Sequence, residues 1–321
     1  MKKIIILLIV LSMFLLIFTG CSNQSEENVP TTLRISTSFA ANSIPFFYML
    51  EENTLGDDID FQVNIHKTRD EATAKILKDE IDMAMLSSQE AANMYNKELD
   101  VKLLNATYGA TFFLLSRNEA INDYTDLVGK EVWTSVKGGP VSFTLNQLLL
   151  NSTIDPNTDI SYKFINLKEL TQLVLNDLKD IEVFSTREPF VSKILASNPD
   201  IKIVYNLDHE WERIFGSRIP LSGVIARNDY LKDNQDMYAL FNSKYDEAIK
   251  WANDNPKEAA ILGAKYLEGL NAKILEKSII NMNLEMVEEK NIKNELDAYF
   301  SQWLEFNPEM VGKKLPGSDF Y

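Results

Sequence analysis

The sequence has one cysteine, two histidines and no cluster of lysine and arginine residues. A single cysteine excludes a disulfide bond within the chain. The 47 Asp and Glu residues outnumber the 32 Lys and Arg residues, which gives a formal charge of −15. Because contact with a nucleic-acid backbone needs clustered basic side chains, this balance argues against a nucleic-acid partner. The sequence also lacks a series of long apolar runs, which excludes a membrane protein with several spans.

The one long apolar run lies at the N-terminus. Ile4–Phe18 follows two lysines and precedes small residues, as in a secretory signal, and is shorter than the ~20 residues that span a bilayer. Phe18-Thr19-Gly20-Cys21 resembles the lipobox of bacterial lipoproteins. The resemblance implies that residues 1–20 are a signal peptide, that Cys21 carries a lipid anchor, and that residues 21–32 are a tether outside the cytoplasmic membrane. Plain secretion and an uncleaved anchor stay open as alternatives.

The rest of the chain alternates strand patterns with helix patterns. Leu33–Thr37 and Met83–Leu86 predict strands, and Asp70–Lys78 between them predicts a helix. The alternation restarts with a strand at Glu131–Val136, and from Asn234 onward the apolar spacing predicts helices only. This order favours an α/β fold with two units, each built on a parallel-rich sheet that helices cover on both faces.

Five short motifs follow one another along the chain. They are Ile44-Pro45-Phe46-Phe47, Glu80-Ile81-Asp82-Met83-Ala84, Asp126-Leu127-Val128-Gly129-Lys130-Glu131-Val132, Arg187-Glu188-Pro189-Phe190, and Trp251-Ala252 with Asn255-Pro256-Lys257-Glu258-Ala259-Ala260. In this order they resemble the extracellular solute-binding proteins of bacterial ABC importers, of the nitrate, sulfonate, taurine and thiamine-pyrimidine type. The resemblance covers about Leu33 to Leu304. The sequence departs from the family at one helix start of the second unit, which is often rich in Gly and Ser but here is Lys137-Gly138-Gly139-Pro140. This departure leaves the class of ligand open.

The resemblance implies the type 2 periplasmic-binding-protein fold, in which two α/β lobes close on a solute like a hinged clamp. Residues 33–114 and 228–321, with the helical C-terminal region, would form lobe 1, and residues 115–227 would form lobe 2. The two crossings between the lobes are expected near Thr111–Arg117 and Ser222–Asn228. Such a protein is expected to be a monomer without a cofactor.

Ligands of open α/β sheets bind where the strands end, so the candidate binding residues follow predicted strands. Hydroxyl groups and free helix N–H groups can hold a polar or anionic group, and aromatic rings can stack on a flat ligand. A single serine is more often a helix cap and a single aromatic ring more often a core residue, but the polar residues as a converging set favour a pocket. Arg187 could pair with a carboxylate or sulfonate, or be neutralised by Glu188. The candidate set is Ser38, Phe39, Asn42, Ser87, Ser88, Tyr108, Gly138, Gly139, Ser142, Arg187 and Trp211.

No motif for catalysis or metal binding is recognisable. His66 and His209 lie far apart without a third ligand at metal spacing, and a Gly-x-Ser-x-Gly motif is absent. The resemblance to solute-binding proteins implies a small-molecule solute, such as a thiamine-pyrimidine-like heterocycle or a sulfonate, and an ABC permease with its ATPase as partners. The lipobox resemblance adds the membrane, through the lipid anchor. Two alternatives stay open: an enzyme on the same scaffold, of the pyrimidine-precursor or menaquinone-pathway type, and a ligand-sensing domain for a membrane kinase.

Overall fold

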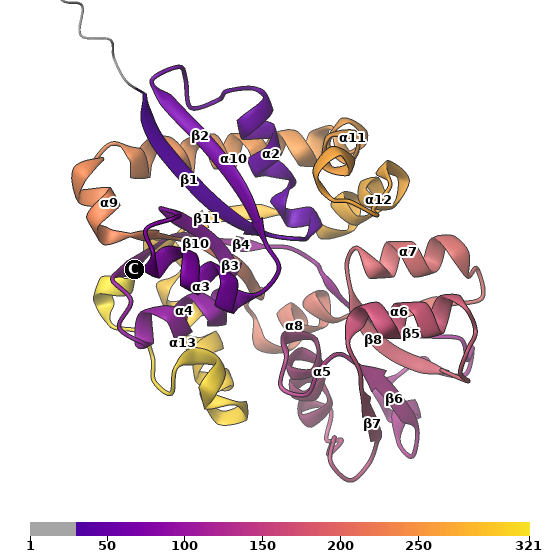
Figure 1. Ribbon diagram of the computed structural model, residues 1–321. Coiled ribbons are helices and arrows are strands. Elements are labelled where there is room, and N and C mark those ends of the chain that lie inside the picture. The colour runs from indigo at the N-terminus through magenta and orange to yellow at the C-terminus, as the bar shows by residue number, and fades with distance from the viewer. Residues whose placement is uncertain (1–29) are drawn as a thin grey trace, which may run out of the picture.

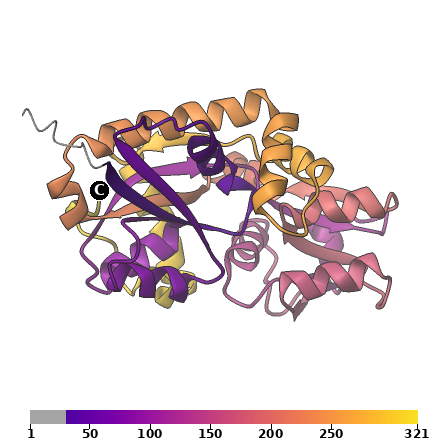
Figure 2. The ribbon, with the colours of Figure 1, turned by 45° about the horizontal axis from the view of Figure 1, so that its top comes forward.

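The computed structural model describes residues 30–321 and shows two α/β lobes (Figures 1 and 2). A six-stranded sheet in the order β11-β4-β10-β3-β1-β2 forms the centre of the first lobe. A five-stranded sheet in the order β7-β6-β8-β5-β9 forms the centre of the second. The predicted α/β fold with two lobes is confirmed. The predicted signal peptide and the predicted lipid anchor at Cys21 lie outside the described residues.

The first sheet is parallel on one side and antiparallel on the other. Its strands are β1 (Thr31–Ser38), β2 (Ile59–His66), β3 (Met83–Ser87), β4 (Val101–Tyr108), β10 (Pro220–Arg227) and β11 (Glu285–Glu288). β1 pairs in parallel with β2 and β3, whereas β10 runs antiparallel between β3 and β4. Because β1, β2 and β3 are parallel, their carboxyl ends at Ser38, His66 and Ser87 lie at one edge of the sheet.

Helices cover both faces of this sheet. Side chains alternate between the faces of a strand, so Leu33, Ile35 and Met83 contact one layer while Ala84 and Leu86 contact the other. The first layer contains α2 (Ile44–Glu51), α10 (Met237–Asp254), α11 (Pro256–Tyr266) and α12 (Ala272–Met282), and the second contains α3 (Arg69–Leu77), α4 (Ser88–Asn96) and α13 (Glu289–Phe306). Shorter helical segments are η1 (Ala41–Ser43), α9 (Asn228–Asp233), η3 (Pro308–Val311) and η4 (Ser318–Phe320). Among residues 30–321, none of the helices combines the length and the apolar character that a membrane crossing requires.

Local sequence signals set several helix starts. Pro45 stands in the first turn of α2, where its missing N–H group costs no hydrogen bond. Thr68 caps α3 because its hydroxyl accepts a hydrogen bond from the N–H of Glu71 at 3.2 Å.

The second sheet is smaller and has parallel strands at its centre. Its strands are β5 (Phe112–Ser116), β6 (Glu131–Thr134), β7 (Ser161–Phe164), β8 (Val183–Arg187) and β9 (Lys202–Asn206). β6 pairs in parallel with β7 and β8, whereas β5 runs antiparallel to β8 and β9. The helical segments of this lobe are η2 (Tyr124–Leu127), α5 (Pro140–Asn151), α6 (Leu167–Leu175), α7 (Phe190–Ser197) and α8 (Leu207–Phe215).

The chain crosses between the lobes twice, and both crossings lie earlier than expected. The first, residues 109–111, joins β4 to β5, whereas the sequence suggested Thr111–Arg117. The second, residues 216–219, joins α8 to β10, whereas the sequence suggested Ser222–Asn228. The apolar pattern of β10 suits a strand of either sheet, and only its pairing with β3 and β4 places it in the first lobe. The first lobe therefore leaves off after β4 and resumes at β10, and the second lobe lies between these strands in the sequence.

A strand also occurs in the C-terminal region, where only helices were expected. β11 has four residues and pairs antiparallel with β4 at the edge of the first sheet. Two of its residues, Glu285 and Glu288, are acidic, so the segment is too short and too polar to show a strand pattern. The open edge of β4 supplies the hydrogen bonds that make it a strand.

α13 belongs to the first lobe but packs against the second. Phe143 of α5 stacks on Trp303 of α13, with ring centroids 3.9 Å apart and planes inclined by 19°. Trp211 of α8 and Tyr299 of α13 contact the same phenyl ring, each with a centroid distance of 5.8 Å. Because these four rings are all buried, the two lobes share one apolar core at this contact.

We expect this shared core to contribute strongly to stability. Replacing Trp303 with Ala removes the ring that stacks on Phe143 and should lower the free energy of unfolding by about 3–5 kcal/mol. Trp303→Phe keeps an aromatic ring at the contact and should cost clearly less. Urea unfolding of both variants measures the difference, and equal losses for the two would refute the role given to the stacked ring.

Candidate functional site

The carboxyl ends of parallel strands from both sheets come together at the boundary between the lobes. In the first lobe β1 ends at Ser38 and β3 at Ser87, and in the second β6 ends at Thr134 and β8 at Arg187. α12 of the first lobe packs against η1, which follows β1, and against α7, which follows β8 (Figure 1). The segments that follow β1 and β8 thus lie beside α12, at the kind of position where open α/β sheets bind ligands.

Glu188 joins the two lobes through its carboxylate. Within its own lobe, Ser192 donates its N–H to Oε2 at 3.2 Å and its hydroxyl to Oε1 at 2.9 Å. Across the boundary, the Ser278 hydroxyl donates to Oε2 at 2.8 Å and the Asn281 amide donates to Oε1 at 2.6 Å. Glu188 is only 1% exposed, and these four donors compensate for the removal of its charge from water.

Arg187 precedes Glu188, and its guanidinium group has neither a hydrogen bond nor an ion pair with any residue in the range 30–321. Its side chain is partly buried, and this burial lowers the pKa of Arg187, an effect that the Glu90 carboxylate of the first lobe opposes. The sequence left open whether Glu188 neutralises Arg187. In the structure the oxygens of Glu188 are taken up by other donors, so the guanidinium group stays available for an anion.

The turn after β1 holds three of the candidate residues. The carbonyl of Ser38 accepts a hydrogen bond from the hydroxyl of Ser43 at 2.5 Å, which fixes the turn. Asn42 is 9% exposed, and its amide donates to the hydroxyl oxygen of Ser222 at 3.4 Å. Phe39 is 38% exposed, which leaves its ring open to contact with a solute.

At the end of β3, Ser88 makes a structural contact and Ser87 is hydrogen-bonded to an acidic residue. The Ser88 hydroxyl donates to the carbonyl of Pro220 at 2.6 Å, and Ser88 is 1% exposed. This hydroxyl joins α4 to β10, so the predicted ligand-binding role of Ser88 does not fit its position. The Ser87 hydroxyl donates to the Glu90 carboxylate at 2.6 Å, and Glu90 in turn acts electrostatically on Arg187.

The glycine loop before α5 passes close to α13. Gly138 has φ of +77°, and a Cβ atom there would lie 2.7 Å from the side-chain nitrogen of Asn307. Gly139 precedes α5 as its N-cap, and the Ser142 hydroxyl donates to the carbonyls of Val136 and Gly139 at 3.1 and 3.0 Å. The hydroxyl of Ser142 is therefore used in hydrogen bonds within the loop and is not free for a solute. Of the predicted contacts in this loop, those through the backbone of Gly138 and Gly139 stay a prediction.

Tyr108 and Trp211 do not match the stacking role predicted for them. Trp211 is 1% exposed and lies in the aromatic core shared by the lobes. Tyr108 is 6% exposed, its hydroxyl donates to Glu295 at 2.7 Å, and the guanidinium group of Arg218 lies 4.5 Å from its ring. An aromatic residue has the same sequence pattern in a core as in a site, which explains why the sequence could not separate the two.

Two polar residues outside the candidate set carry unpaired atoms beside the boundary. The Gln89 amide nitrogen in the first turn of α4 and the Thr186 hydroxyl in β8 are buried and lack a hydrogen-bond partner within residues 30–321. Buried polar atoms without partners are uncommon and point to a ligand or an ordered water molecule. In the sequence, Gln89 follows the candidate residue Ser88 and Thr186 precedes the candidate residue Arg187. These positions next to candidate residues at strand ends were the sequence signal for Gln89 and Thr186.

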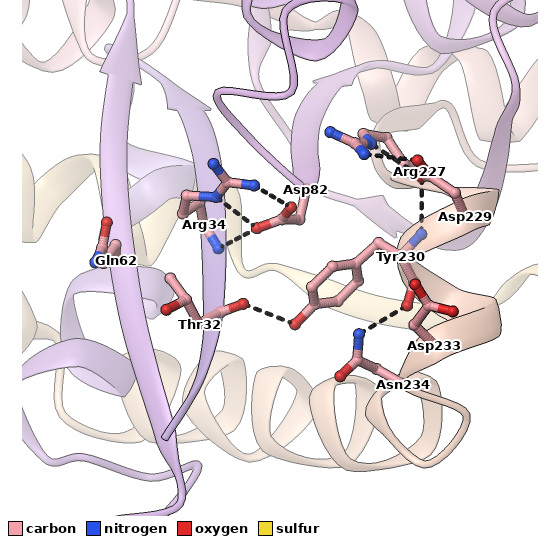
Figure 3. Close-up of a pocket in the computed structure, with 9 residues that line it drawn as sticks. All are labelled: Thr32, Arg34, Gln62, Asp82, Arg227, Asp229, Tyr230, Asp233 and Asn234. Atoms are coloured by element: carbon pink, nitrogen blue, oxygen red, sulfur yellow. Dashed lines mark hydrogen bonds and ion pairs between the residues drawn. The ribbon is translucent and has the colours of Figure 1, made fainter. Parts of the chain in front are cut away.

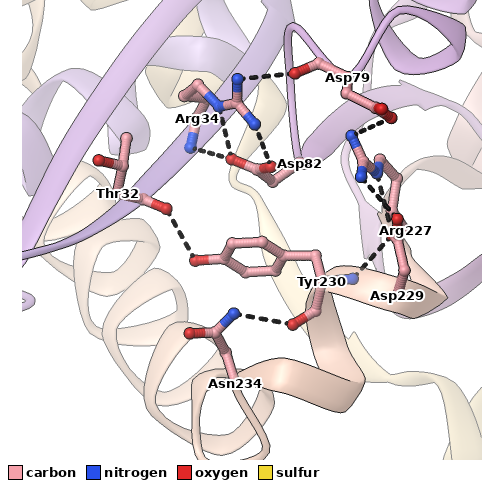
Figure 4. Close-up of polar contacts among 8 residues, drawn as sticks. All are labelled: Thr32, Arg34, Asp79, Asp82, Arg227, Asp229, Tyr230 and Asn234. Atoms are coloured by element: carbon pink, nitrogen blue, oxygen red, sulfur yellow. Dashed lines mark hydrogen bonds and ion pairs between the residues drawn. The ribbon is translucent and has the colours of Figure 1, made fainter.

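A cavity of about 410 Å³ lies elsewhere, at the amino-terminal end of β1 (Figure 3). Arg34 donates to both carboxylate oxygens of Asp82, at 2.9 and 2.6 Å, and to the carbonyl of Asp79 at 2.7 Å. Arg227 pairs with the carboxylates of Asp79 and Asp229 at 2.5 and 2.6 Å (Figure 4). Because both guanidinium groups already have carboxylate partners, we interpret this network as a structural connection between β1, β10 and α9.

The two histidines lie apart, on β2 and α8. His66 is 5% exposed, and its Nδ1 lies 3.0 Å from the hydroxyl oxygen of Ser36, whereas His209 is exposed. Within residues 30–321 no group of three or more His, Cys, Asp or Glu side chains is arranged to hold a metal ion.

The stability of the protein should depend on pH through His66. Burial lowers the pKa of His66 from 6.5 to about 4. Below pH 6.5 the unfolded chain therefore takes up a proton that the folded chain does not bind until about pH 4. The free energy of unfolding should fall by roughly 3 kcal/mol as the pH decreases across this window. Denaturation at a series of pH values should show that the free energy of unfolding depends less on pH in His66→Gln than in the wild type, whereas the control His209→Gln should behave like the wild type. An unchanged pH dependence in His66→Gln would contradict this account.

Closure of the lobes should depend on Glu188. Glu188→Gln replaces one carboxylate oxygen with an NH₂ group. In either orientation of the amide this NH₂ group faces an N–H donor, from Ser192 or from Asn281, so at least one charge-assisted hydrogen bond is lost. A loss of about 1.5–3 kcal/mol corresponds to a shift of roughly 10- to 100-fold towards the open state. Small-angle X-ray scattering should report a larger radius of gyration for this variant than for Glu258→Gln, which changes an exposed residue of α11. Identical scattering for the two variants would contradict the role of Glu188.

Comparison with known proteins shows the fold and the family. No curated protein matches the sequence. Among solved structures, an ABC transporter from Parabacteroides distasonis has 21% identity and a TM-score of 0.75, with 90% of this chain and 98% of that chain covered. The periplasmic aliphatic sulphonate binding protein SsuA from Escherichia coli has 14% identity and a TM-score of 0.74, with 91% and 96% covered. The periplasmic nitrate-binding protein NrtA from Synechocystis PCC 6803 has 14% identity and a TM-score of 0.58, with 91% and 84% covered.

At these identities the similarity shows a shared fold, and it confirms the predicted periplasmic-binding-protein fold. The sequence also matches a family model described as menaquinone biosynthesis over residues 33–300. Because this match spans well over half of the sequence, the chain belongs to the menaquinone biosynthesis family.

Proposed function

We propose that the protein is the solute-binding component of an ABC importer and that it captures a small organic solute between its lobes. The observation that carries this proposal is the Arg187 guanidinium group, which lies unpaired at the boundary of the lobes within the described part of the chain. The unpaired atoms of Gln89 and Thr186 supply further hydrogen-bonding capacity. Closure of the lobes around the solute would give the permease a shape to recognise.

The solute that suits this site carries an anionic group on an organic body. A carboxylate or sulfonate can form two parallel hydrogen bonds with Arg187, and the exposed ring of Phe39 can contact an apolar or heterocyclic part. Two proteins of the same fold are named for the binding of sulphonate and nitrate. The net charge of −15 would repel an anion at long range, but salt screens this repulsion within about 10 Å.

The proposed place of action is outside the cytoplasmic membrane. The lipobox-like segment before Cys21 supports a lipid anchor, and residues 21–30 would connect this anchor to β1. An anchored monomer that delivers its solute to a permease and the ATPase of that permease fits this arrangement.

A second candidate function is an enzyme that transforms a small molecule between the lobes. The family match to menaquinone biosynthesis favours it. The acids at the boundary are engaged, however, because the Glu188 carboxylate accepts four hydrogen bonds and the Glu90 carboxylate accepts one from Ser87. A general base must reach the proton it removes, so we favour binding without conversion.

The proposal is tested with a panel of small carboxylates, sulfonates, nitrate and anionic heterocycles in a thermal-shift assay, followed by calorimetry. We expect at least one anion to bind, and we expect Arg187→Gln to weaken its binding by roughly 100-fold because the anion loses its charged partner. Arg213→Gln, which changes an exposed arginine paired with Glu210 on α8, should leave the affinity unchanged. Equal affinities for the two variants would contradict the site.

The fate of the solute separates the two functions. Mass spectrometry of the solute recovered after prolonged incubation should show an unchanged compound. A converted compound would support the enzyme instead, and no binding anywhere in the panel would count against an anion site at Arg187.

A further inference from the structure

A second cavity, of about 260 Å³, lies at the hinge between the lobes. Both crossings line it, through Gly109 and Ala110 in the first and Arg218 and Ile219 in the second. The first turns of α8 from the second lobe and the last turn of α12 from the first complete its walls. The space is well above what one water molecule needs, and a change in the angle between the lobes must change its shape.

Asp208 of α8 is a buried acidic residue in the lining of this cavity. Its Oδ2 accepts hydrogen bonds from the backbone N–H groups of Thr111 and Phe112, at 2.8 and 2.7 Å, which attach α8 to the first crossing. Its Oδ1 has no hydrogen-bond partner in the described chain, although Asp208 is only 7% exposed. A buried carboxylate oxygen without a donor is unfavourable, so this atom provides a strong acceptor for a donor placed in the cavity.

The charges around the cavity favour a cation. Glu212, one turn after Asp208, adds a second carboxylate to the lining. Of the two basic residues in the lining, Arg218 is ion-paired with Glu285 and lies over the ring of Tyr108, and His209 is an exposed residue of α8. Because residues 30–321 contain no cluster of ligands arranged to hold a metal ion, an ammonium group suits the cavity better than a metal ion does.

We propose that the hinge cavity binds a small organic cation, whose ammonium group donates to Oδ1 of Asp208 and lies near the carboxylate of Glu212. The bound cation contacts both crossings and both lobes, so it stabilises the hinge in the arrangement seen here. This site is separate from the proposed solute site, because Arg187 does not line the hinge cavity.

The binding should weaken as the pH decreases. Burial raises the pKa of Asp208 to about 7, and its hydrogen bonds with the backbone of Thr111 and Phe112 and the charge of Arg218 oppose this rise. Tyr299 of α13 interacts electrostatically with Asp208, and burial raises its own pKa, so it stays neutral. The other titratable residues of the lining on α8 are His209 and Glu212. Only the ionised carboxylate attracts an ammonium group, so the affinity should be about tenfold lower at pH 6 than at pH 8.

The test uses propylammonium chloride as the probe, with sodium chloride and propan-1-ol as matched controls, in the absence of any solute. Saturable chemical-shift changes at the backbone amides of Gly109, Ala110 and Ile219 should appear with propylammonium and with neither control. Asp208→Asn keeps an acceptor for the two backbone N–H groups but places an NH₂ group at the free position, so it should weaken binding at least tenfold.

Further variants keep the proposal falsifiable if Asp208→Asn folds poorly. Glu212→Gln changes an exposed residue and should weaken binding several-fold, whereas Glu258→Gln on α11 and Arg187→Gln should leave it unchanged. Absence of saturable shifts, equal shifts with the controls, or unchanged affinity in Asp208→Asn or Glu212→Gln would each overturn the proposal. Because Arg187 does not line the hinge cavity and the titration contains no solute, a failure of one site is distinguishable from a failure of the other.

Discussion

The carboxylate of Glu188, buried between the lobes, is the interaction on which the rest of this structure depends. Its two oxygens accept hydrogen bonds from Ser192 in its own lobe and from Ser278 and Asn281 of α12 in the other. A buried carboxylate needs such donors, so the lobes can separate only if donors are replaced by water or other groups. The same contacts occupy Glu188 fully, and the neighbouring Arg187 therefore keeps an unpaired guanidinium group within the described chain.

α12 connects the two proposed sites of the molecule. Its Asn281 donates to Glu188 at the boundary where the solute site is proposed, and the same residue lines the hinge cavity. Asp208, across that cavity, accepts hydrogen bonds from the first crossing. Closure of the lobes, the solute site and the hinge cavity thus share one set of contacts, and binding at either site can bias the other only through the angle between the lobes.

The family and the fold describe different aspects of this protein. Membership in the menaquinone biosynthesis family comes from the sequence match, whereas the similar solved structures have the fold of proteins named as binding proteins or a transporter. One fold supports both binding and catalysis, so function follows from the chemistry of the site. Here that chemistry is a guanidinium group without a partner in the described chain, next to acids that are already hydrogen-bonded, and this is the basis of our proposal that the protein binds an anion without converting it.

The sequence by itself determined the α/β class, the two units and the strand ends near which polar groups gather, because these follow from local periodicity and from where parallel strands end. It did not determine the partners of individual side chains. Ser88, Ser142 and Trp211 proved to be engaged in structural contacts, whereas Gln89 and Thr186 carry the unpaired atoms. Only the tertiary structure decided these assignments, together with the sheet that contains β10, because they depend on contacts between residues far apart in the chain.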